Sequence, residues 1–107
     1  MSDLGLVLGA VADPTRRAIL DRLARGPARV TDVAEPFDMS LNAVSKHVKV
    51  LETAGLVKRI REGREHRLVL NAAPLREVSR WAHRYEGFWN ERLDRLGSFF
   101  ADRRSKS

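Results

Sequence analysis

A change of hydrophobic period in the middle of the chain constrains its fold more than any other feature. Residues 40–54 repeat apolar side chains at helical spacing, and Gly55 follows where a left-handed residue ends a helix. Residues 57–61 and 66–70 alternate as two strands, and Gly63 lies in the turn between them. Because a two-stranded hairpin is marginal by itself, it must pack against helices. The sequence therefore predicts a helix followed by a hairpin on one shared core.

Shorter helical patterns precede this unit. Residues 4–11 repeat apolar side chains at helical spacing and predict a short first helix. Asp13 is a good N-cap for a second helix, in which Pro14 takes the first position without losing a hydrogen bond. Gly26 ends that helix, and Thr31 can cap a third, short one. We therefore expect three short helices ahead of the central one.

The C-terminal third predicts one long amphipathic helix from Leu75 to about Ala101. Such a helix is about 40 Å long, more than a domain of this size covers on one side. Its aromatic stripe would stay exposed in a monomer, which usually marks an association surface, although these rings could instead line a ligand pocket. We therefore expect a symmetric dimer. Its predicted interface residues are Leu4, Val7, Leu8, Trp81, Tyr85, Phe88, Trp89 and Leu96.

Positive charge is concentrated in the central segment. The whole chain carries a formal net charge of +6. Residues 40–70 alone contain seven Lys or Arg and three Glu, a net charge of +4. A basic block inside patterned sequence indicates a surface for a polyanion, most simply nucleic acid; the alternative is a solvated face without a partner.

The helix predicted over residues 40–54 has two different faces. Its apolar side contains Val44, Val48 and Leu51, with Leu41 in line with them. The opposite side holds small polar groups and lysines, which can approach base edges and phosphates in a major groove. A basic hairpin tip can reach the neighbouring minor groove. The predicted DNA-binding residues are Ser40, Asn42, Ser45, Lys46, His47, Lys49, Arg61 and Arg64.

Some polar side chains keep two interpretations. His47 lies on the flank of the central helix, so a hydrogen-bonded structural role is as good an assignment as a phosphate contact. Arg16 and Arg17, at the start of the second helix, are further candidates for phosphate contact, with ordinary solvation as the alternative.

Helices and hairpin in this order predict a mainly α fold with a small β-hairpin, a winged helix-turn-helix with N- and C-terminal dimerisation helices. The 107 residues suit one domain, which we place at residues 1–101. We assign dimerisation to about 3–12 and 75–101 and DNA binding to about 31–70. A loose basic tail follows at 102–107.

Other function classes find no support in the sequence. The absence of cysteine excludes disulfides, thiolate metal sites and cysteine catalysis. The chain has no Ser/His/carboxylate motif and no phosphate-binding glycine loop, so we expect no enzyme. No apolar run approaches the roughly 18–20 residues of a membrane helix, and the N-terminal residues carry Asp3 but no Lys or Arg, unlike a secretory signal. We therefore expect a cytoplasmic protein without a membrane partner.

Several blocks of the chain resemble one known family. Residues 13–20, DPTRRAIL, resemble the second helix of ArsR/SmtB-like bacterial repressors, and residues 40–51 resemble their recognition helix. Residues 52–57 are similar to the family's exit into the wing, and residues 61–64 to its wing tip. The resemblance covers about residues 4–100. It implies a dimeric winged helix-turn-helix regulator on nucleoid DNA, usually a repressor that a ligand or metal releases.

The sensor sites of that family are incomplete in this sequence. Where thiolate-sensing members carry a cysteine pair, residues 31–35 read TDVAE. His83 and Glu86 match half of the family's metal site on the last helix, but residues 70–72 read LNA in place of the other half. Two ligands per chain are too few for a tetrahedral site. We therefore expect no metal and no cofactor, and either an unidentified small-molecule effector or none.

The leading hypothesis is a homodimeric repressor that binds a palindromic operator in double-stranded DNA, with two recognition helices in successive major grooves. One alternative is a metal-responsive sensor of the same fold. The other is a winged-helix module for protein–protein interaction, which an apolar outward face on residues 40–54 would favour. The sequence places polar and basic residues there.

Overall fold

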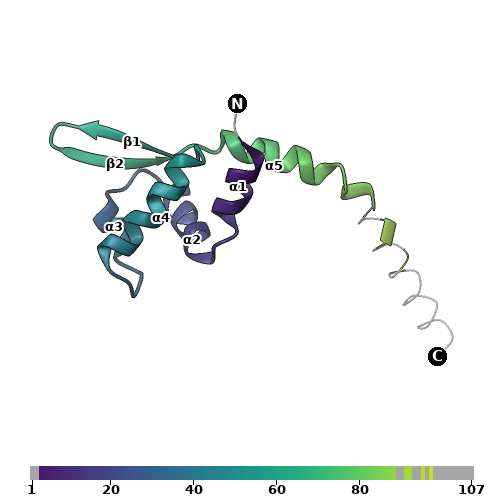
Figure 1. Cartoon of the computed structure of the whole chain (residues 1–107), viewed down its shortest axis with the longest axis horizontal. Helices are drawn as coiled ribbons and strands as arrows, with labels where there is room; N and C mark the ends of the chain where they lie inside the picture. Colours follow the sequence, from purple (N-terminus) through teal and green to yellow (C-terminus); the bar gives the residue numbers. More distant parts are fainter. Residues whose placement is uncertain (1–2, 89–90, 93–94, 96, 98–107) are drawn as a thin grey trace.

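Helices surround the root of a hairpin in the computed structural model, which describes residues 3–88, 91–92, 95 and 97. The elements in chain order are α1 (Leu4–Val11), α2 (Pro14–Ala24), α3 (Val30–Ala34), α4 (Leu41–Thr53), β1 (Val57–Glu62), β2 (Glu65–Leu70) and α5 (Ala73–His83). Figure 1 shows α1 to α4 gathered into one body, with the hairpin extending from one side and α5 from the other. The predicted class, mainly helical with a hairpin wing, is confirmed.

Side-chain caps fix where three of the helices begin. The Asp13 carboxylate accepts a hydrogen bond from the Thr15 amide at 3.0 Å, with Pro14 in the first turn of α2. The Ser40 hydroxyl accepts from the Ala43 amide at 3.1 Å at the start of α4. Asp3 caps α1 in the same manner. These bonds satisfy amides that have no partner inside the helix, so the predicted caps at Asp13 and Ser40 are confirmed.

The predicted cap at Thr31 is wrong. The helix α3 begins one residue earlier, at Val30, and its N-cap Arg29 makes no capping bond through its side chain. Instead the Arg29 guanidinium donates to the Asp32 carboxylate at 3.1 Å, and this hydrogen bond lowers the pKa of Asp32. An ion pair across the first turn thus takes the place of a hydroxyl cap.

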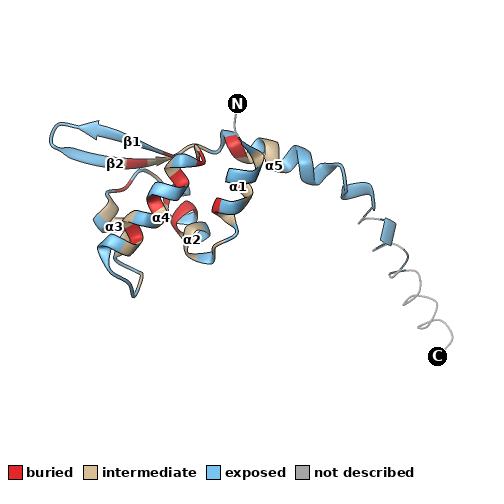
Figure 2. Cartoon of the chain, in the orientation of Figure 1, coloured by how far each residue is buried: buried red, intermediate tan, exposed pale blue. Residues whose placement is uncertain are grey.

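The core lies where α1 to α4 meet the root of the hairpin. Buried side chains from every one of these elements form a single cluster, drawn red in Figure 2. Its fully buried large members are Val7, Ile19, Val33, Val44, Val48, Leu51, Leu56 and Leu68. Leu41 was expected beside Val44 but is 49% exposed, because it is the first residue of α4 and lies beyond this layer.

A short contact with the α2–α3 loop anchors the hairpin. The strands pair antiparallel from Val57 opposite Leu70 to Glu62 opposite Glu65, around a two-residue turn. Gly63 has a φ of 63° and no other residue of the turn has a positive φ, as in a type II′ turn. At the root, Leu68 and Ala28 exchange both backbone hydrogen bonds, at 2.8 and 3.1 Å. The outer half of the hairpin therefore projects from a fixed base.

The predicted single helix from Leu75 to about Ala101 is wrong within its described part. The helix α5 ends at His83, and a turn at residues 84–85 precedes further helical residues at 86–88. Trp, His and Tyr, which occupy this stretch, are weaker helix formers than Leu or Ala. Residues 81–88 are all exposed, so little burial compensates for that weakness.

We predict that Leu51→Ala lowers the free energy of unfolding by about 2–5 kcal/mol, because it opens a cavity in the core. Leu41→Ala, the same substitution on the exposed first residue of α4, serves as the control and changes this free energy by less than about 0.5 kcal/mol. Denaturant unfolding followed by circular dichroism measures both. Equal losses in the two variants would contradict the burial described for α4.

Candidate nucleic-acid interface

The outward face of α4 carries a polar stripe. Asn42, Ser45, Lys46 and Lys49 follow one another at helical spacing; three of them are exposed, and Ser45 is half-buried. The opposite face holds Val44, Val48 and Leu51, all fully buried. The predicted orientation of α4 is therefore observed, and its polar side chains point away from the core.

The three carboxylates of residues 40–70 are held in ion pairs. Arg59 bonds Glu52 at 2.8 Å, which joins β1 to the end of α4. Arg67 lies 3.3 Å from Glu62 across the hairpin. Arg29, from the α2–α3 loop, lies 3.4 Å from Glu65. The negative charge of residues 40–70 is thus neutralised locally.

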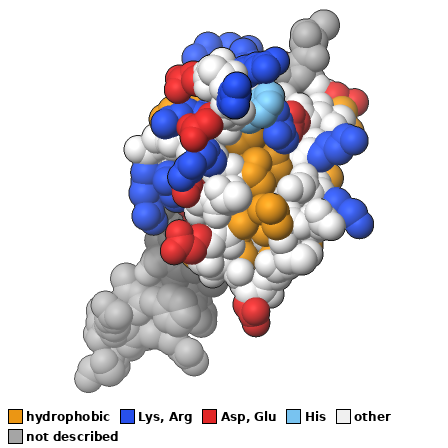
Figure 3. Space-filling model, turned by 90° about the vertical axis from the view of Figure 1, so that its left-hand side faces the viewer, with side chains coloured by type: hydrophobic (Ala, Val, Ile, Leu, Met, Phe, Trp, Pro, Cys, Tyr) orange, Lys and Arg blue, Asp and Glu red, His pale blue; other side chains and the backbone are white. Residues whose placement is uncertain are grey.

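The remaining cations of this segment face solvent without a carboxylate. Among the described residues, no ion pair is formed by Lys46, Lys49, Lys58, Arg61 or Arg64, and all five are exposed. Figure 3 shows Lys and Arg side chains gathered over the hairpin end of the molecule. Uncompensated positive charge of this kind attracts phosphates.

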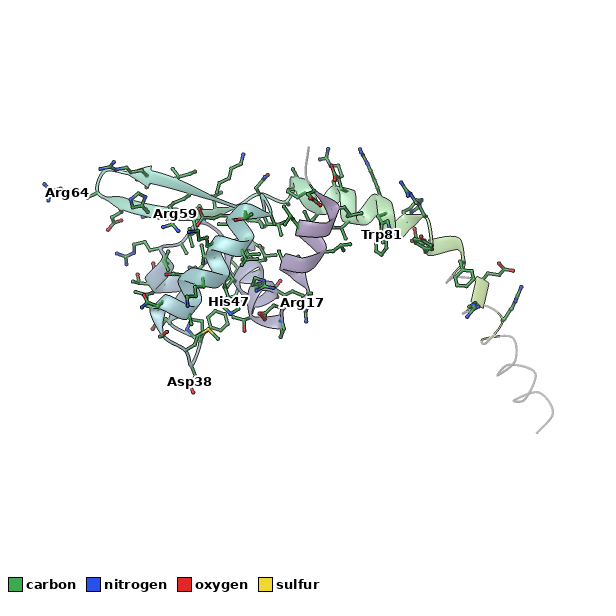
Figure 4. All side chains as sticks on the ribbon, viewed as in Figure 1. Arg17, Asp38, His47, Arg59, Arg64 and Trp81 are labelled. Carbon is green, nitrogen blue, oxygen red and sulfur yellow. The ribbon has the colours of Figure 1, made fainter. Side chains whose placement is uncertain are left out.

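The wing carries its cations outward. Arg64 lies at the far tip of the hairpin in Figure 4, well away from the helical body. The Arg61 guanidinium donates to the Gly63 carbonyl at 3.1 Å and so braces the turn. The sequence placed both residues at the tip, and the structure agrees; which of them touches DNA stays a prediction.

His47 lies on the flank of α4 in a polar cluster. Its Nδ1 atom is 3.2 Å from Nη1 of Arg16 and 3.5 Å from the Asp13 carboxylate. The structural role that the sequence left open is thus present. A phosphate contact by the same ring stays a prediction.

Arg16 and Arg17 both bond to the end of α1; Arg16 is half-buried there and Arg17 is exposed, and a phosphate contact by either stays a prediction. Arg16 donates to the carbonyls of Ala10 at 2.7 Å and Gly9 at 3.1 Å. Arg17 donates to the next two carbonyls, of Val11 at 2.7 Å and Ala12 at 3.0 Å. The last carbonyls of α1 have no partner inside the helix, and these guanidinium groups supply one.

The predicted dimer surface is exposed on α5 and its continuation. Trp81 is 39% exposed, Tyr85 49% and Phe88 48%, and the rings of Trp81 and Tyr85 meet edge to face. Figure 4 shows Trp81 and Arg64 on opposite sides of the helical body. Trp89 and Leu96, also predicted for the interface, lie outside the described residues.

The assignment of α1 to that surface needs one correction. Val7 is fully buried in the protomer's own core, so its side chain cannot contact a partner. Leu4 and Leu8 are half-buried, whereas Leu6, which sequence reasoning missed, is 48% exposed. Since α1 is apolar around nearly its whole circumference, the sequence held no polar face that could have separated these positions.

Other sites are sparse in the described part of the chain. His83 Nδ1 contacts the Glu86 carboxylate, and both side chains are exposed. Among the described residues, His, Cys, Asp and Glu nowhere gather in groups of three or more that could hold a metal ion. Every described helix is too short or too polar to cross a membrane.

Known proteins resemble this chain in sequence. The profile of a helix-turn-helix domain family matches residues 11–60. The regulator Rv2034 of Mycobacterium tuberculosis is 56% identical over 48 residues, which make up 45% of this chain and 45% of that protein. The transcriptional repressor SdpR of Bacillus subtilis is 36% identical over 75 residues, which cover 70% of this chain and 83% of SdpR. The chain thus matches less than half of Rv2034 but most of SdpR.

Solved structures extend the likeness to the fold. The ArsR family transcriptional regulator RHA00566 superposes with a TM-score of 0.74 at 37% identity, over 84% of this chain and 97% of that one. The winged helix-turn-helix domain of Mb0332 from Mycobacterium bovis has a TM-score of 0.59 at 29% identity, over 84% of this chain and 81% of that one. With the capped α4, its polar outward face and the hairpin wing, the chain belongs to the ArsR/SmtB-like family of DNA-binding, winged helix-turn-helix transcriptional regulators.

Proposed function

We propose that this chain is a homodimeric repressor that binds a palindromic operator in double-stranded DNA in the bacterial cytoplasm. One observation carries the proposal: unpaired cations surround the polar face of α4 at one end of the body, and exposed aromatic rings lie on α5 and the residues after it at the other. The cations suit contact with DNA phosphates, and the rings suit contact with a second copy.

The two-fold arrangement draws support from the exposed rings of Trp81, Tyr85 and Phe88. Apolar area of this kind is costly in water, and a second copy would bury it along a two-fold axis. The solved Mb0332 domain is described as homodimeric. We assign dimerisation to about residues 3–12, with Leu6 in place of Val7, and to the segment from residue 75 to about 101.

We assign DNA binding to about residues 31–70. Asn42, Ser45 and Lys46 take the positions on α4 from which side chains reach base edges or phosphates along a major groove. Lys49 and the Ser40 hydroxyl contact phosphates at the ends of this stripe. The hydroxyl accepts the capping bond but can still donate its proton. Arg61 and Arg64 serve the neighbouring groove.

The alternatives receive less support. A metal-responsive sensor would need more ligands than His83 and Glu86 supply, so a small molecule is the better effector class. A protein–protein module would require an apolar outward face on α4, where the described residues are mainly polar or basic.

Selection of bound fragments from random double-stranded DNA tests the function. The enriched sequence is expected to be an imperfect palindrome whose half-site centres lie about 10–10.5 base pairs, or a multiple of this, apart. Enrichment of sequences without symmetry would contradict the two-fold arrangement. Absence of any enrichment would contradict sequence-specific binding.

We predict that Lys46→Gln and Arg64→Gln each weaken binding to the selected operator and reduce the steepness of its salt dependence. The slope of log K against log salt concentration falls by about one for each lost phosphate contact. The control replaces Arg59 and its partner together (Arg59→Gln with Glu52→Gln), which removes a neutral ion pair and leaves the slope unchanged. Gel-shift titrations at several salt concentrations measure the slopes; equal slopes in all variants would refute these roles.

We predict that Trp81→Asp shifts the protein from dimer to monomer, because it places a charge in the buried seam of the pair. Met39→Asp, at a similarly exposed apolar residue outside α5, leaves the dimer intact. Sedimentation velocity at micromolar concentration measures the oligomeric state. A dimeric Trp81→Asp protein would place the interface elsewhere.

A further inference from the structure

One side chain ties together the helix assigned to the dimer and the helix assigned to DNA. The Arg16 guanidinium starts from α2, donates to the carbonyls of Gly9 and Ala10 at the end of α1, and reaches the His47 ring on α4. It is also 3.7 Å from the Asp13 carboxylate, which caps α2. Its side chain is only 18% exposed.

In the contact between Arg16 and His47, the arginine is the hydrogen-bond donor. A guanidinium has donors only, so the bond forms when Nδ1 of His47 is free to accept it. Asp13 lies within 4 Å of both partners and keeps the guanidinium in place. Because the guanidinium is planar and its donors are fixed relative to one another, a bond to α1 also fixes the bond to α4.

The neighbouring residue shows what is special about Arg16. Arg17 has the same charge and length, and it also donates to two carbonyls of α1. Its described hydrogen bonds do not involve α4, however. Together the two arginines serve four consecutive carbonyls, from Gly9 to Ala12, but only Arg16 extends the network to the helix that faces DNA.

We infer that Arg16 is a positioning residue for DNA recognition, which sets the placement of α4 relative to the dimer axis by linking it to α1. The inference rests on the proposed function, in which α1 belongs to the interface and α4 enters the major groove. A symmetric pair reads an operator only when its two recognition helices match the spacing of the half-sites. A rigid connection between α1 and α4 therefore makes the dimer selective for operators with one spacing of the half-sites.

The test uses the full chain with Arg16→Met and, as matched control, Arg17→Met. Both variants lose one charge and the same carbonyl-capping function, but only Arg16→Met breaks the link to α4. Gel-shift titrations use the selected operator and versions of it with one or two base pairs inserted or deleted between the half-sites, together with a non-specific duplex. Sedimentation velocity and thermal unfolding follow dimerisation and stability.

The wild type is expected to bind the native spacing at least about tenfold more tightly than the altered ones. In Arg16→Met this preference falls to about twofold, while the dimer and the affinity for the non-specific duplex are retained. Arg17→Met keeps the wild-type spacing profile. A full spacing preference in Arg16→Met, or an equal loss in both variants, would overturn the inference.

A second pair of variants covers the case in which Arg16→Met folds poorly. His47→Leu removes the acceptor on α4 and leaves the bonds from Arg16 to α1 in place. We expect His47→Leu to reduce the preference for the native spacing. The double variant, Arg16→Met with His47→Leu, should reduce it no further, since both substitutions break the same link. A His47→Leu protein with the full spacing preference, or additive effects, would overturn the inference. A wild type that lacks any spacing preference would instead refute the proposed function itself.

Discussion

The burial of one face of α4 is the constraint on which the rest of the structure depends. Val44, Val48 and Leu51 are fully buried at the centre of the core, and each contributes about 1.5–3 kcal/mol by leaving water. That burial fixes the rotation of the helix about its own axis. The stripe of Asn42, Ser45, Lys46 and Lys49 must then face outward, although none of the hydrogen bonds and ion pairs among the described residues involves these side chains. The packing that makes the fold stable thus presents the surface to which we assign DNA binding.

The ion pairs around α4 affect the electric field at the protein surface more than they affect the stability of the fold. Pairs as exposed as Arg59 with Glu52 or Arg29 with Glu65 contribute little to folding. Their effect is to neutralise the carboxylates of the segment, so that its five unpaired cations are not opposed nearby. Because field strength at a surface depends on the local balance of charge, a segment of modest net charge becomes a distinctly positive face.

Apart from the cap at Thr31, the sequence predicted most of what depends on local chemistry and missed what depends on tertiary contact. The caps at Asp13 and Ser40, the two faces of α4 and the turn at Gly63 follow from hydrogen bonding, helical periodicity and glycine's backbone freedom, which operate within a few residues. The buried side of α1 could not be predicted, because a helix that is apolar all round gives no direction. The end of α5 at His83 was missed because helical periodicity continues through exposed residues whose helix propensity is weak. The bonds of Arg16 and Arg17 could not be predicted either, because they depend on carbonyls at the end of another helix.

Two copies of a DNA-reading helix are useful only if their separation is held, and the fold meets this need with few contacts. The helix α5 extends away from the body in Figure 1 and packs mainly on α1, so α1 is the element through which an arm assigned to dimerisation meets the rest of the protomer. Its C-terminal carbonyls are fixed by Arg16 and Arg17, and α4 joins that same network at His47. Hydrogen bonds have strict geometry, whereas apolar contacts tolerate sliding. A polar link between α1 and α4 therefore fixes their relative position in a way that the surrounding core does not.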